Sequence, residues 1–324
     1  MKAVLCTQYG GPELLEIREA ESPLPGDGEV VINVKAAGLN FFDTLIINNK
    51  YQFKPELPFS PGAEVAGVIS GLGSNVTDLK IGDRVMAYTV WGGVREEVAV
   101  DQQAVIRMPD GLGFEVAAGL IVTYGTSLHA LRDRANIQPA ETLAVLGASG
   151  GVGQAAVEIG KAMGARVIAC ASSDDKLEFC KALGADETVN YSTEDIKTRL
   201  KELSDGNGVD VIYDPVGADL AEPAFRAIGW KGRFLVVGFA GGSIPRIPLN
   251  LALLKGCQIV GVFWGDHLVR EPQLHRANMT QLLDWVMEGK IRPHIHKVYS
   301  LAQTSEALLA IARREVRGKV IVTP

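Results

Sequence analysis

The pattern of apolar and polar positions changes character near residue 120. Before that point, short runs rich in Val, Ile and Ala alternate with turns marked by Gly and Pro. This regular spacing is typical of a β-rich domain built as a partly closed barrel. A helical pattern follows over residues 114–134, with an interruption at 123–126. We expect strands at residues 4–6, 14–18, 29–36, 64–72, 84–87 and 93–100.

From about residue 121 to residue 264, buried strand patterns alternate with helical ones. The expected strands are 143–146, 166–171, 187–189, 209–213, 233–237 and 258–263, and the expected helices are 152–163, 174–182, 194–203, 219–228 and 249–255. This α/β alternation predicts a doubly wound parallel sheet of the Rossmann type.

Beyond residue 264 the pattern predicts helices at 272–288 and 302–313 and strands at 295–299 and 319–322. We expect this segment to return to the β-rich domain and complete it. The predicted organisation is therefore a β-rich domain over residues 1–120 and 265–324, and an α/β domain of the Rossmann type over residues 121–264.

One stretch, residues 142–164, organises the second domain. An apolar run from Leu143 to Leu146 leads into Ala148-Ser149-Gly150-Gly151-Val152-Gly153 and then directly into an amphipathic helix. Strand, glycine turn and helix in this order predict a dinucleotide site. Gly150 lets backbone approach a pyrophosphate, Gly153 lets the helix pack on the strand, and the helix N-terminus favours negative charge. A glycine turn without a ligand is the alternative, which the repeated strand–helix units disfavour.

Composition excludes several classes of function. The 324 residues are 47% hydrophobic and 22% charged, as in ordinary globular proteins, and the length fits two domains. A formal net charge of −6 argues against nucleic acid or an anionic membrane as the main partner. No apolar run reaches transmembrane length, and the N-terminus reads as a strand rather than a signal peptide. The four cysteines lie far apart, which favours a reducing compartment, and we expect a cytoplasmic enzyme.

Several short motifs follow one another in a specific order. They are Ala37-Gly38-Leu39-Asn40 with Asp43, Leu57-Pro58-Phe59-Ser60-Pro61-Gly62, Gly82-Asp83-Arg84-Val85, Tyr124-Gly125-Thr126, the glycine turn at 147–153, Leu183-Gly184-Ala185, Asp214-Pro215-Val216-Gly217 and Gly318-Lys319-Val320. In this order they resemble the medium-chain dehydrogenase/reductase superfamily, and within it the quinone oxidoreductases related to zeta-crystallin. The resemblance covers essentially the whole chain. It implies a GroES-like β-rich catalytic domain, a Rossmann domain and a cofactor bound in the cleft between them.

The same resemblance predicts that no metal is bound. Zinc-dependent members of the superfamily carry a catalytic Cys, His and Cys where this chain has Asn40, Ala63 and Ala118. The four-cysteine loop of their structural zinc is also missing, since residues 88–100 contain no cysteine. Zinc needs three or four N, S or O ligands in fixed geometry, and the five histidines do not restore the set.

The choice of cofactor depends on the end of the second Rossmann strand, about 20 residues beyond the glycines. An NAD enzyme has Asp or Glu there, whereas this chain has Ala171-Ser172-Ser173 followed by Asp174-Asp175-Lys176. Small hydroxyls and a lysine suit a phosphate, and the resemblance adds Tyr191 beside the adenine and Arg314 at the 2′-phosphate. In the alternative interpretation, Ser173 or Asp174 is a helix N-cap and Lys176 is a solvated charge. Asp174 and Asp175 also lower the local positive potential. We expect NADPH.

At the reacting end, the resemblance implies that Asn40, Asp43 and Tyr51 line the nicotinamide and the substrate. The neutral amide of Asn40 can hydrogen-bond a carbonyl group without the Lewis acidity of a metal. Tyr51 is equally well interpreted as an aromatic side chain on a surface loop. Asp43 is better interpreted as a structural residue that caps a helix or bonds backbone.

The resemblance also implies contacts on the cofactor side. It places Thr123 and the turn Gly238-Phe239-Ala240 near the nicotinamide. Phe263-Trp264 would end the last strand of the sheet, where family members pair across a two-fold axis; the alternative is an aromatic pair in the core of one domain. We therefore expect a homodimer. The predicted cofactor-binding residues are Thr123, Ala148, Ser149, Gly150, Gly151, Val152, Gly153, Ser172, Ser173, Lys176, Tyr191, Gly238, Phe239, Ala240, Phe263 and Arg314.

Three functions remain open at this point. The first is an NADPH-dependent oxidoreductase that transfers hydride to a quinone or a similar conjugated carbonyl compound without zinc. The second is a zinc-free reductase of α,β-unsaturated aldehydes, ketones or acyl thioesters. The third, from another class, is a nucleotide-bound protein with a binding or structural role. Lens crystallins that belong to the resembled family illustrate such a role. We expect an enzyme with a small-molecule substrate, and neither nucleic acid nor a membrane as its main partner.

Overall fold

The computed structural model describes all 324 residues, which divide into two units. Unit 1 contains Met1–Val122 and Pro293–Pro324, and unit 2 contains Thr123–Arg292. The sequence places residues 265–292 in the first domain, whereas the structure places them in unit 2. The reason is that helices α9 (Trp264–Arg270) and α10 (Pro272–Met287) bury side chains inside unit 2.

Unit 1 contains nine strands and three α-helices that lie wholly within it. The strands are β1 (Lys2–Cys6), β2 (Leu15–Glu19), β3 (Glu29–Leu39), β4 (Glu64–Leu72), β5 (Arg84–Tyr88), β6 (Glu97–Asp101), β7 (Val105–Arg107), β14 (Ile295–Ser300) and β15 (Lys319–Thr323). The helices are α1 (Phe41–Ile47), α2 (Phe114–Ala118) and α11 (Thr304–Ala312). Short 3₁₀ turns are η1 (Pro12–Leu14), η2 (Gln102–Ala104) and η4 (Leu301–Gln303).

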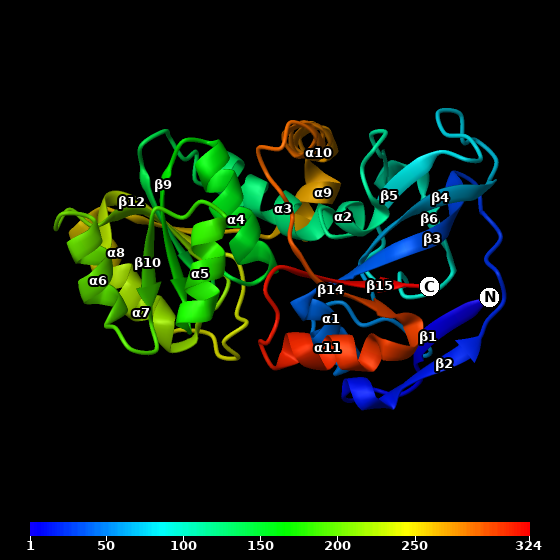
Figure 1. Ribbon diagram of the computed structural model, residues 1–324, viewed down its shortest axis with the longest axis horizontal. Coiled ribbons are helices and arrows are strands. Elements are labelled where there is room, and N and C mark those ends of the chain that lie inside the picture. Colours follow the sequence, from blue (N-terminus) through cyan, green and yellow to red (C-terminus); the bar gives the residue numbers. More distant parts are fainter. The chain divides into compact units, whose positions relative to one another are not determined.

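The main sheet of unit 1 is centred on β3. Its order is β14-β15-β3-β4-β5-β7, with β6 also paired to β3, and β1 and β2 form a separate ladder (Figure 1). The register of β3 against β4 shifts twice, between Val31 and Ile32 and between Val34 and Ala36. Such irregularities bend a strand, and they let one long strand pair with β6 near its start and with β15 near its end.

Unit 2 is built on a six-stranded parallel sheet. Its strands are β8 (Thr142–Leu146), β9 (Arg166–Ala171), β10 (Glu187–Asn190), β11 (Val209–Asp214), β12 (Ile228–Val236) and β13 (Gln258–Gly261). Its further helices are α4 (Gly151–Ala162), α5 (Asp174–Ala182), α6 (Ile196–Leu203), α7 (Ala218–Arg226) and α8 (Asn250–Lys255). The strand order β10-β9-β8-β11-β12-β13 is the Rossmann order, so the predicted doubly wound sheet is confirmed.

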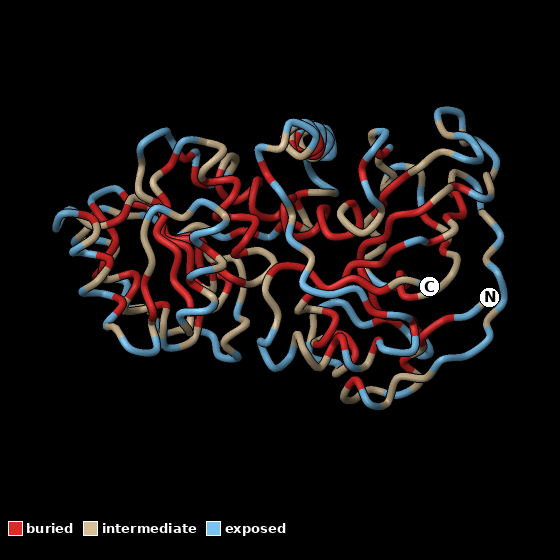
Figure 2. The backbone as a smooth tube through the Cα atoms, in the orientation of Figure 1, coloured by how far each residue is buried: buried red, intermediate tan, exposed pale blue.

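The central strands of this sheet are apolar, and Figure 2 shows that they are buried. Leu143–Leu146 of β8 and Val167–Cys170 of β9 have no exposed surface, because helices flank the sheet on either side of each crossover. The strand order reverses between β8 and β11. Ligands of open α/β sheets bind beyond the carboxyl ends of the strands at this point.

The helical pattern after residue 114 breaks earlier than predicted. Helix α2 ends at Ala118, helix α3 (Ile121–Leu128) follows, and the predicted interruption at 123–126 is wrong because those residues are helical. Gly119, the C-cap of α2, ends that helix. Helix α3 runs directly into a π-helix, η3 (His129–Arg134), which the sequence pattern did not reveal.

The last strand of the sheet is shorter than predicted. Strand β13 ends at Gly261, so Phe263 and Trp264 lie outside it. Phe263 lies at the N-cap of α9 and is 49% exposed, whereas Trp264 begins the helix and is buried. A Cβ atom on Gly125 would lie 3.0 Å from the Trp264 indole nitrogen, so this glycine makes room for the ring. The two aromatic residues therefore have different environments.

None of the helices combines the length and the apolar character that a bilayer-spanning segment requires.

Candidate active site

The two glycines of the turn between β8 and α4 have different roles. A Cβ atom on Gly153 would lie 2.3 Å from the carbonyl oxygen of Gly147, so the packing of α4 on the turn itself requires glycine there. A Cβ atom on Gly150 would have no atom nearer than 3.5 Å, again the Gly147 oxygen. The fold does not require glycine at 150. The N-terminus of α4 beside it is the kind of position at which folds of this type bind a phosphate.

Loops at the carboxyl ends of the central strands meet around this turn. The Ala148 amide donates to the Cys170 oxygen at the end of β9 (3.0 Å), and a Cβ atom on Gly147 would lie 2.8 Å from Val216 after β11. The turn after β12 is attached to the same place, since the Ala240 amide donates to the Pro215 oxygen (3.0 Å). The structure thus brings together the predicted segments 147–153, 214–217 and 238–240.

Asp214 shapes the loop after β11. One oxygen of its buried carboxylate accepts hydrogen bonds from the amides of Val216 and Gly217, both at 2.8 Å. Burial raises the pKa of this carboxyl, and the two backbone amides oppose the rise. Phe239 lies against this loop, because a Cβ atom on Gly217 would meet its ring at 2.9 Å.

The residues predicted to surround a 2′-phosphate lie at the ends of β9 and β10. Lys176 donates to the Ser172 hydroxyl (3.2 Å), and the Tyr191 amide donates to the Ala171 oxygen (3.1 Å). Ser173 is the N-cap of α5, but its side chain caps no backbone amide. The carboxylate of Asp174 accepts a hydrogen bond from Asn190 (2.8 Å). The Ser173 hydroxyl is therefore available to a ligand, whereas the carboxylate of Asp174 is already bonded to Asn190.

In unit 1, a buried ion pair holds the Asn40 amide. Lys319 donates to Asn40 Oδ1 (2.7 Å), to Glu64 Oε1 (2.8 Å) and to the Leu39 carbonyl oxygen (2.9 Å). Asn40 Nδ2 donates to the same Glu64 oxygen at 3.0 Å, while the Val122 amide donates to Glu64 Oε2 at 2.9 Å. Lys319 and Glu64 are 2% and 0% exposed, so this pair is fully desolvated.

These contacts fix which way the Asn40 amide points. An ammonium donor requires the amide oxygen, and a carboxylate acceptor requires the amide nitrogen. The NH₂ group has two hydrogens, and Glu64 takes one of them. Gly38 is part of the same arrangement, since a Cβ atom there would lie 2.0 Å from the Ala118 oxygen and 2.8 Å from the Glu64 side chain.

Asp43 supports the backbone beside Asn40. Its carboxylate accepts the Asn40 amide at the start of α1 (2.7 Å) and the Gly62 amide (3.0 Å), and it is completely buried. These are the capping and backbone bonds predicted for a structural Asp43. Burial raises the pKa of the carboxyl to about 7, although the two amides and the charge of Lys319 lower it.

Tyr51 belongs to an aromatic group in unit 1. Its ring stacks on Phe42 with centroids 5.3 Å apart, and Phe53 is tilted against it at 5.8 Å. Burial and the negative charge of Asp43 raise the pKa of the phenol. Tyr51 therefore lies on the loop after α1, half-buried against Phe42 of that helix, and its part in the reaction stays a prediction.

The other predicted residues are placed as follows. Thr123 is buried on α3 in unit 2, and Phe263 lies between β13 and α9. Arg314 belongs to unit 1, where it follows α11 with a φ of 60°. Its contact with a 2′-phosphate stays a prediction.

Residues at the three zinc-ligand positions do not fit a metal. Ala63 and Ala118 have no donor atom, and the Asn40 oxygen already accepts from the Lys319 ammonium. Glu64 and Lys319 were not predicted as site residues, although Lys319 lies in a motif that carries the resemblance. Their contact with Asn40 spans 24 and 279 residues of chain, which no local pattern reveals.

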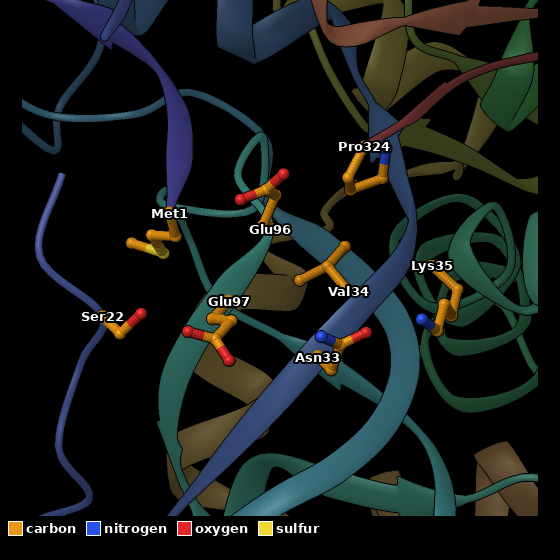
Figure 3. Close-up of a pocket in the computed structure, with 8 residues that line it drawn as sticks. All are labelled: Met1, Ser22, Asn33, Val34, Lys35, Glu96, Glu97 and Pro324. Atoms are coloured by element: carbon orange, nitrogen blue, oxygen red, sulfur yellow. The ribbon is translucent and has the colours of Figure 1, made fainter. Parts of the chain in front are cut away.

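A surface recess of about 460 Å³ lies elsewhere on unit 1 (Figure 3). Its lining comes from the two chain ends, from strands β3 and β6 and from the segments that precede these strands, and it includes none of the predicted site residues. The lining residues are Met1, Ser22, Asn33, Val34, Lys35, Glu96, Glu97 and Pro324.

Comparison with known families supports both units. Residues 26–124 match the alcohol dehydrogenase GroES-like domain, and residues 151–287 match the zinc-binding dehydrogenase family. The quinone oxidoreductase-like protein 2 homolog of Nematostella vectensis is 40% identical, over 99% of this chain and 88% of that protein. The quinone oxidoreductase of Pseudomonas aeruginosa is 33% identical, over 100% and 99%.

The chain belongs to the medium-chain dehydrogenase/reductase family. Its fold is a GroES-like domain with a Rossmann domain, and it is an oxidoreductase, as the sequence predicts. A solved structure of similar fold is the Escherichia coli quinone oxidoreductase complexed with NADPH, with a TM-score of 0.94 and 27% identity over the whole of both chains.

Proposed function

We propose that this oxidoreductase uses NADPH to reduce quinones and similar conjugated carbonyl compounds, and that it does so without zinc. The observation that carries the proposal is the Asn40 amide, held by Lys319 and Glu64 where zinc-dependent relatives have a metal ligand. The names of the relatives support the acceptor class, and the NADPH complex of the Escherichia coli protein supports the cofactor.

The second unit is proposed to hold the dinucleotide. The pyrophosphate would lie at Gly150, beside the start of α4, where a side chain is absent for no reason internal to the fold. Ser172, Ser173 and Lys176 are proposed to contact the 2′-phosphate, with Tyr191 beside the adenine. No acidic residue ends β9, which removes the usual acceptor for the ribose hydroxyls of NADH.

When bound, NADPH supplies a hydride. Asn40 then has one N–H beyond the one that Glu64 accepts, and we propose that this N–H donates to the oxygen of the acceptor. Hydride addition to a quinone or an enone places negative charge on that oxygen. A preorganised donor stabilises such charge by about 2.7–4 kcal/mol in a dry site.

The proton that completes the reduction needs no strong acid. A quinone or an enone spreads the incoming charge over a conjugated system, so that water can deliver the final proton. The raised pKa of Tyr51 keeps its phenol protonated at neutral pH. Its packing on Phe42 accounts for this residue without a role in proton transfer. An unactivated alcohol would need a base or a metal to remove its proton, and the site contains neither zinc ligands nor an assigned base.

The proposal extends to assembly and location. Strand β13 is an open edge of the six-stranded sheet, and Ile259 on it and Phe263 beyond it are 41% and 49% exposed. We infer a homodimer across this edge, because an unpaired apolar edge strand favours pairing. The four free cysteines fit a reducing cytoplasm.

The test is an acceptor panel read by loss of nicotinamide absorbance. Metal-stripped protein is given NADPH or NADH with quinones, with enones including acyl thioesters, and with no acceptor; the reverse assay offers simple alcohols and NADP⁺. We expect turnover of conjugated acceptors, a preference for NADPH, and no effect of chelators. Turnover that depends on added zinc in stripped protein that is still folded would refute the metal-free reaction. Cofactor binding without turnover of any acceptor would favour the non-catalytic role.

A further inference from the structure

Three histidines that are far apart in sequence come together in unit 2. His129 begins the π-helix η3, His267 lies on α9 and His275 on α10. The rings of His129 and His267 stack with centroids 3.9 Å apart and planes 18° from parallel. The ring of His275 lies edge-on to that of His267 at 6.2 Å. His129 and His267 are 5% and 4% exposed, so two imidazoles share a desolvated place.

Two carboxylates orient the stacked rings. His129 Nδ1 lies 2.9 Å from Asp133 Oδ2, and His267 Nδ1 lies 2.8 Å from Glu271 Oε2. Arg132 donates to the other Asp133 oxygen and fixes that carboxylate. When His267 donates Nδ1–H to Glu271, its lone pair lies on Nε2, which has no protein partner. Metal-binding histidines are typically oriented in this way.

Several buried polar atoms of the same cluster lack a protein partner. They are His267 Nε2, His275 Nδ1 and Asn278 Oδ1. The amide nitrogen of Asn278 donates to Asp133 (2.8 Å), so this residue belongs to the cluster. Buried polar atoms in native proteins are nearly always paired with protein, water or an ion. Three such atoms among these residues are open to an ion or to ordered water.

The backbone gives a second reason to expect a site here. Residues 129–134 form a π-helix that directly extends α3. π-Helical turns are rare and frequently occur at functional sites. This turn carries both His129 and Asp133, four residues apart, and directs them to the partners on α9 and α10.

We propose that His129, Asp133 and His267 bind one divalent transition-metal ion, best Zn²⁺, with His275 beside it. Each of the three offers a ligand atom, and these atoms lie within 4.8 Å of one another. Ligands on a tetrahedral zinc, at bonds of about 2.0–2.2 Å, are about 3.4 Å apart, so the groups must draw together on binding. Asp133 then exchanges its hydrogen bond with His129 for the ion, and the two rings turn out of their parallel stack so that both lone pairs meet at the metal. The bound ion would join η3 to α9 and thereby stabilise unit 2. The site uses none of the residues proposed for the reaction.

The test measures metal binding directly in untagged, chelator-treated protein. Zn²⁺ affinity comes from competition with a chromophoric chelator, and the donor set from the visible spectrum of the Co²⁺ form. We expect one ion per chain, a spectrum without the intense ultraviolet band of a Co–thiolate bond, and a raised melting temperature. His129→Gln and His267→Gln should each weaken binding at least a hundredfold. Glu271→Gln, which keeps every ligand, should weaken it about tenfold or more.

The matched control removes two other histidines. His294 and His296 lie in unit 1, so His294→Gln/His296→Gln should bind the ion as the wild type does. If a glutamine variant fails to fold, imidazole ¹⁵N shifts of the wild type on Zn²⁺ addition still identify the ligands. Absence of binding below millimolar Zn²⁺ overturns the proposal and leaves ordered water as the partner of these atoms. Binding that survives in His129→Gln and His267→Gln, or is lost in the control, overturns it as well.

Discussion

Asn40 is useful to the proposed reaction only because both ends of its amide are held. Replacing Asn40 by Ala removes the proposed oxyanion donor, so we expect kcat with a quinone to fall by about 10²–10³-fold. Asn48→Ala is the matched control, because this amide contacts only the Thr44 carbonyl at the other end of α1. Steady-state kinetics at saturating NADPH measures both. A kcat of Asn40→Ala within twofold of wild type would exclude the role.

The same prediction has a second part that separates positioning from stability. Lys319→Met/Glu64→Gln removes both charges together, since removing one partner of a buried pair costs about 3–5 kcal/mol of stability. We expect this variant to lower kcat nearly as far as Asn40→Ala, and the triple variant to lose little more. If the kcat loss of the triple variant equals the product of the losses in Asn40→Ala and in the double variant, the ion pair acts independently of Asn40.

Asp43 gives unit 1 a characteristic pH dependence. Its pKa is about 7 in the folded chain against 3.8 for an exposed carboxyl. Between these values the folded state holds a proton that the unfolded state has lost, so stability falls as pH rises from about 4 to about 7 and levels off above. The full difference corresponds to about 4 kcal/mol.

Two measurements check this expectation. The ¹³C resonance of the Asp43 carboxyl, assigned with Asp43→Asn, should titrate near pH 7. The melting temperature of the wild type should fall relative to that of Asp43→Asn over the same rise in pH. A carboxyl that titrates near pH 4 would contradict the burial argument.

The two glycines of the turn between β8 and α4 are expected to respond in opposite ways to replacement by alanine. Gly150→Ala should leave the melting temperature near that of the wild type, because its Cβ meets nothing nearer than 3.5 Å, but should raise the KM for NADPH about tenfold or more. Gly153→Ala should lower the melting temperature, because its Cβ would lie 2.3 Å from a backbone oxygen. The reverse pattern would show that the pyrophosphate lies elsewhere.

The start of helix α5 is where cofactor choice is proposed to be made. We expect the wild type to prefer NADPH to NADH by at least tenfold, or about 1.4 kcal/mol. Lys176→Glu should raise the KM for NADPH and leave that for NADH nearly unchanged, since only NADPH has a 2′-phosphate. Lys181→Glu on the same helix is the control, because Lys181 is an exposed residue paired with Glu178. Equal effects on both cofactors would refute the phosphate contact.

The sequence predicts the bounds of strands and helices that have a regular apolar pattern, and it misses short elements that have none. The strands β4 and β9 and the helix α5 have the predicted bounds, because apolar runs between clear turn signals define them. Helix α1 was missed, since seven residues rich in Phe and Ile show no helical period and its start depends on Asp43. Strand β7 and helix α9 are likewise too short for a pattern.

The fold class of the full chain was predictable from the sequence, whereas the site was only partly predictable. The ordered motifs and the alternation of strands and helices predict both domains. The network around Asn40 joins positions 40, 64, 122 and 319, and only the completed sheet of unit 1 brings β3, β4 and β15 together. The histidine cluster of unit 2 is equally invisible in the sequence, because its members come from three separate helices.

The central claim is direct hydride transfer to a conjugated acceptor, and deuterium transfer tests it most directly. NADPH deuterated at both C4 positions is incubated with the metal-stripped enzyme and an enone, whose carbon-bound label, unlike that of a hydroquinone, does not exchange with water. We predict one deuterium per turnover at the β-carbon of the product, and none there when unlabelled NADPH is used in D₂O. A reduced product without this label, or steady oxidation of simple alcohols with no enone or quinone turnover, would contradict the account.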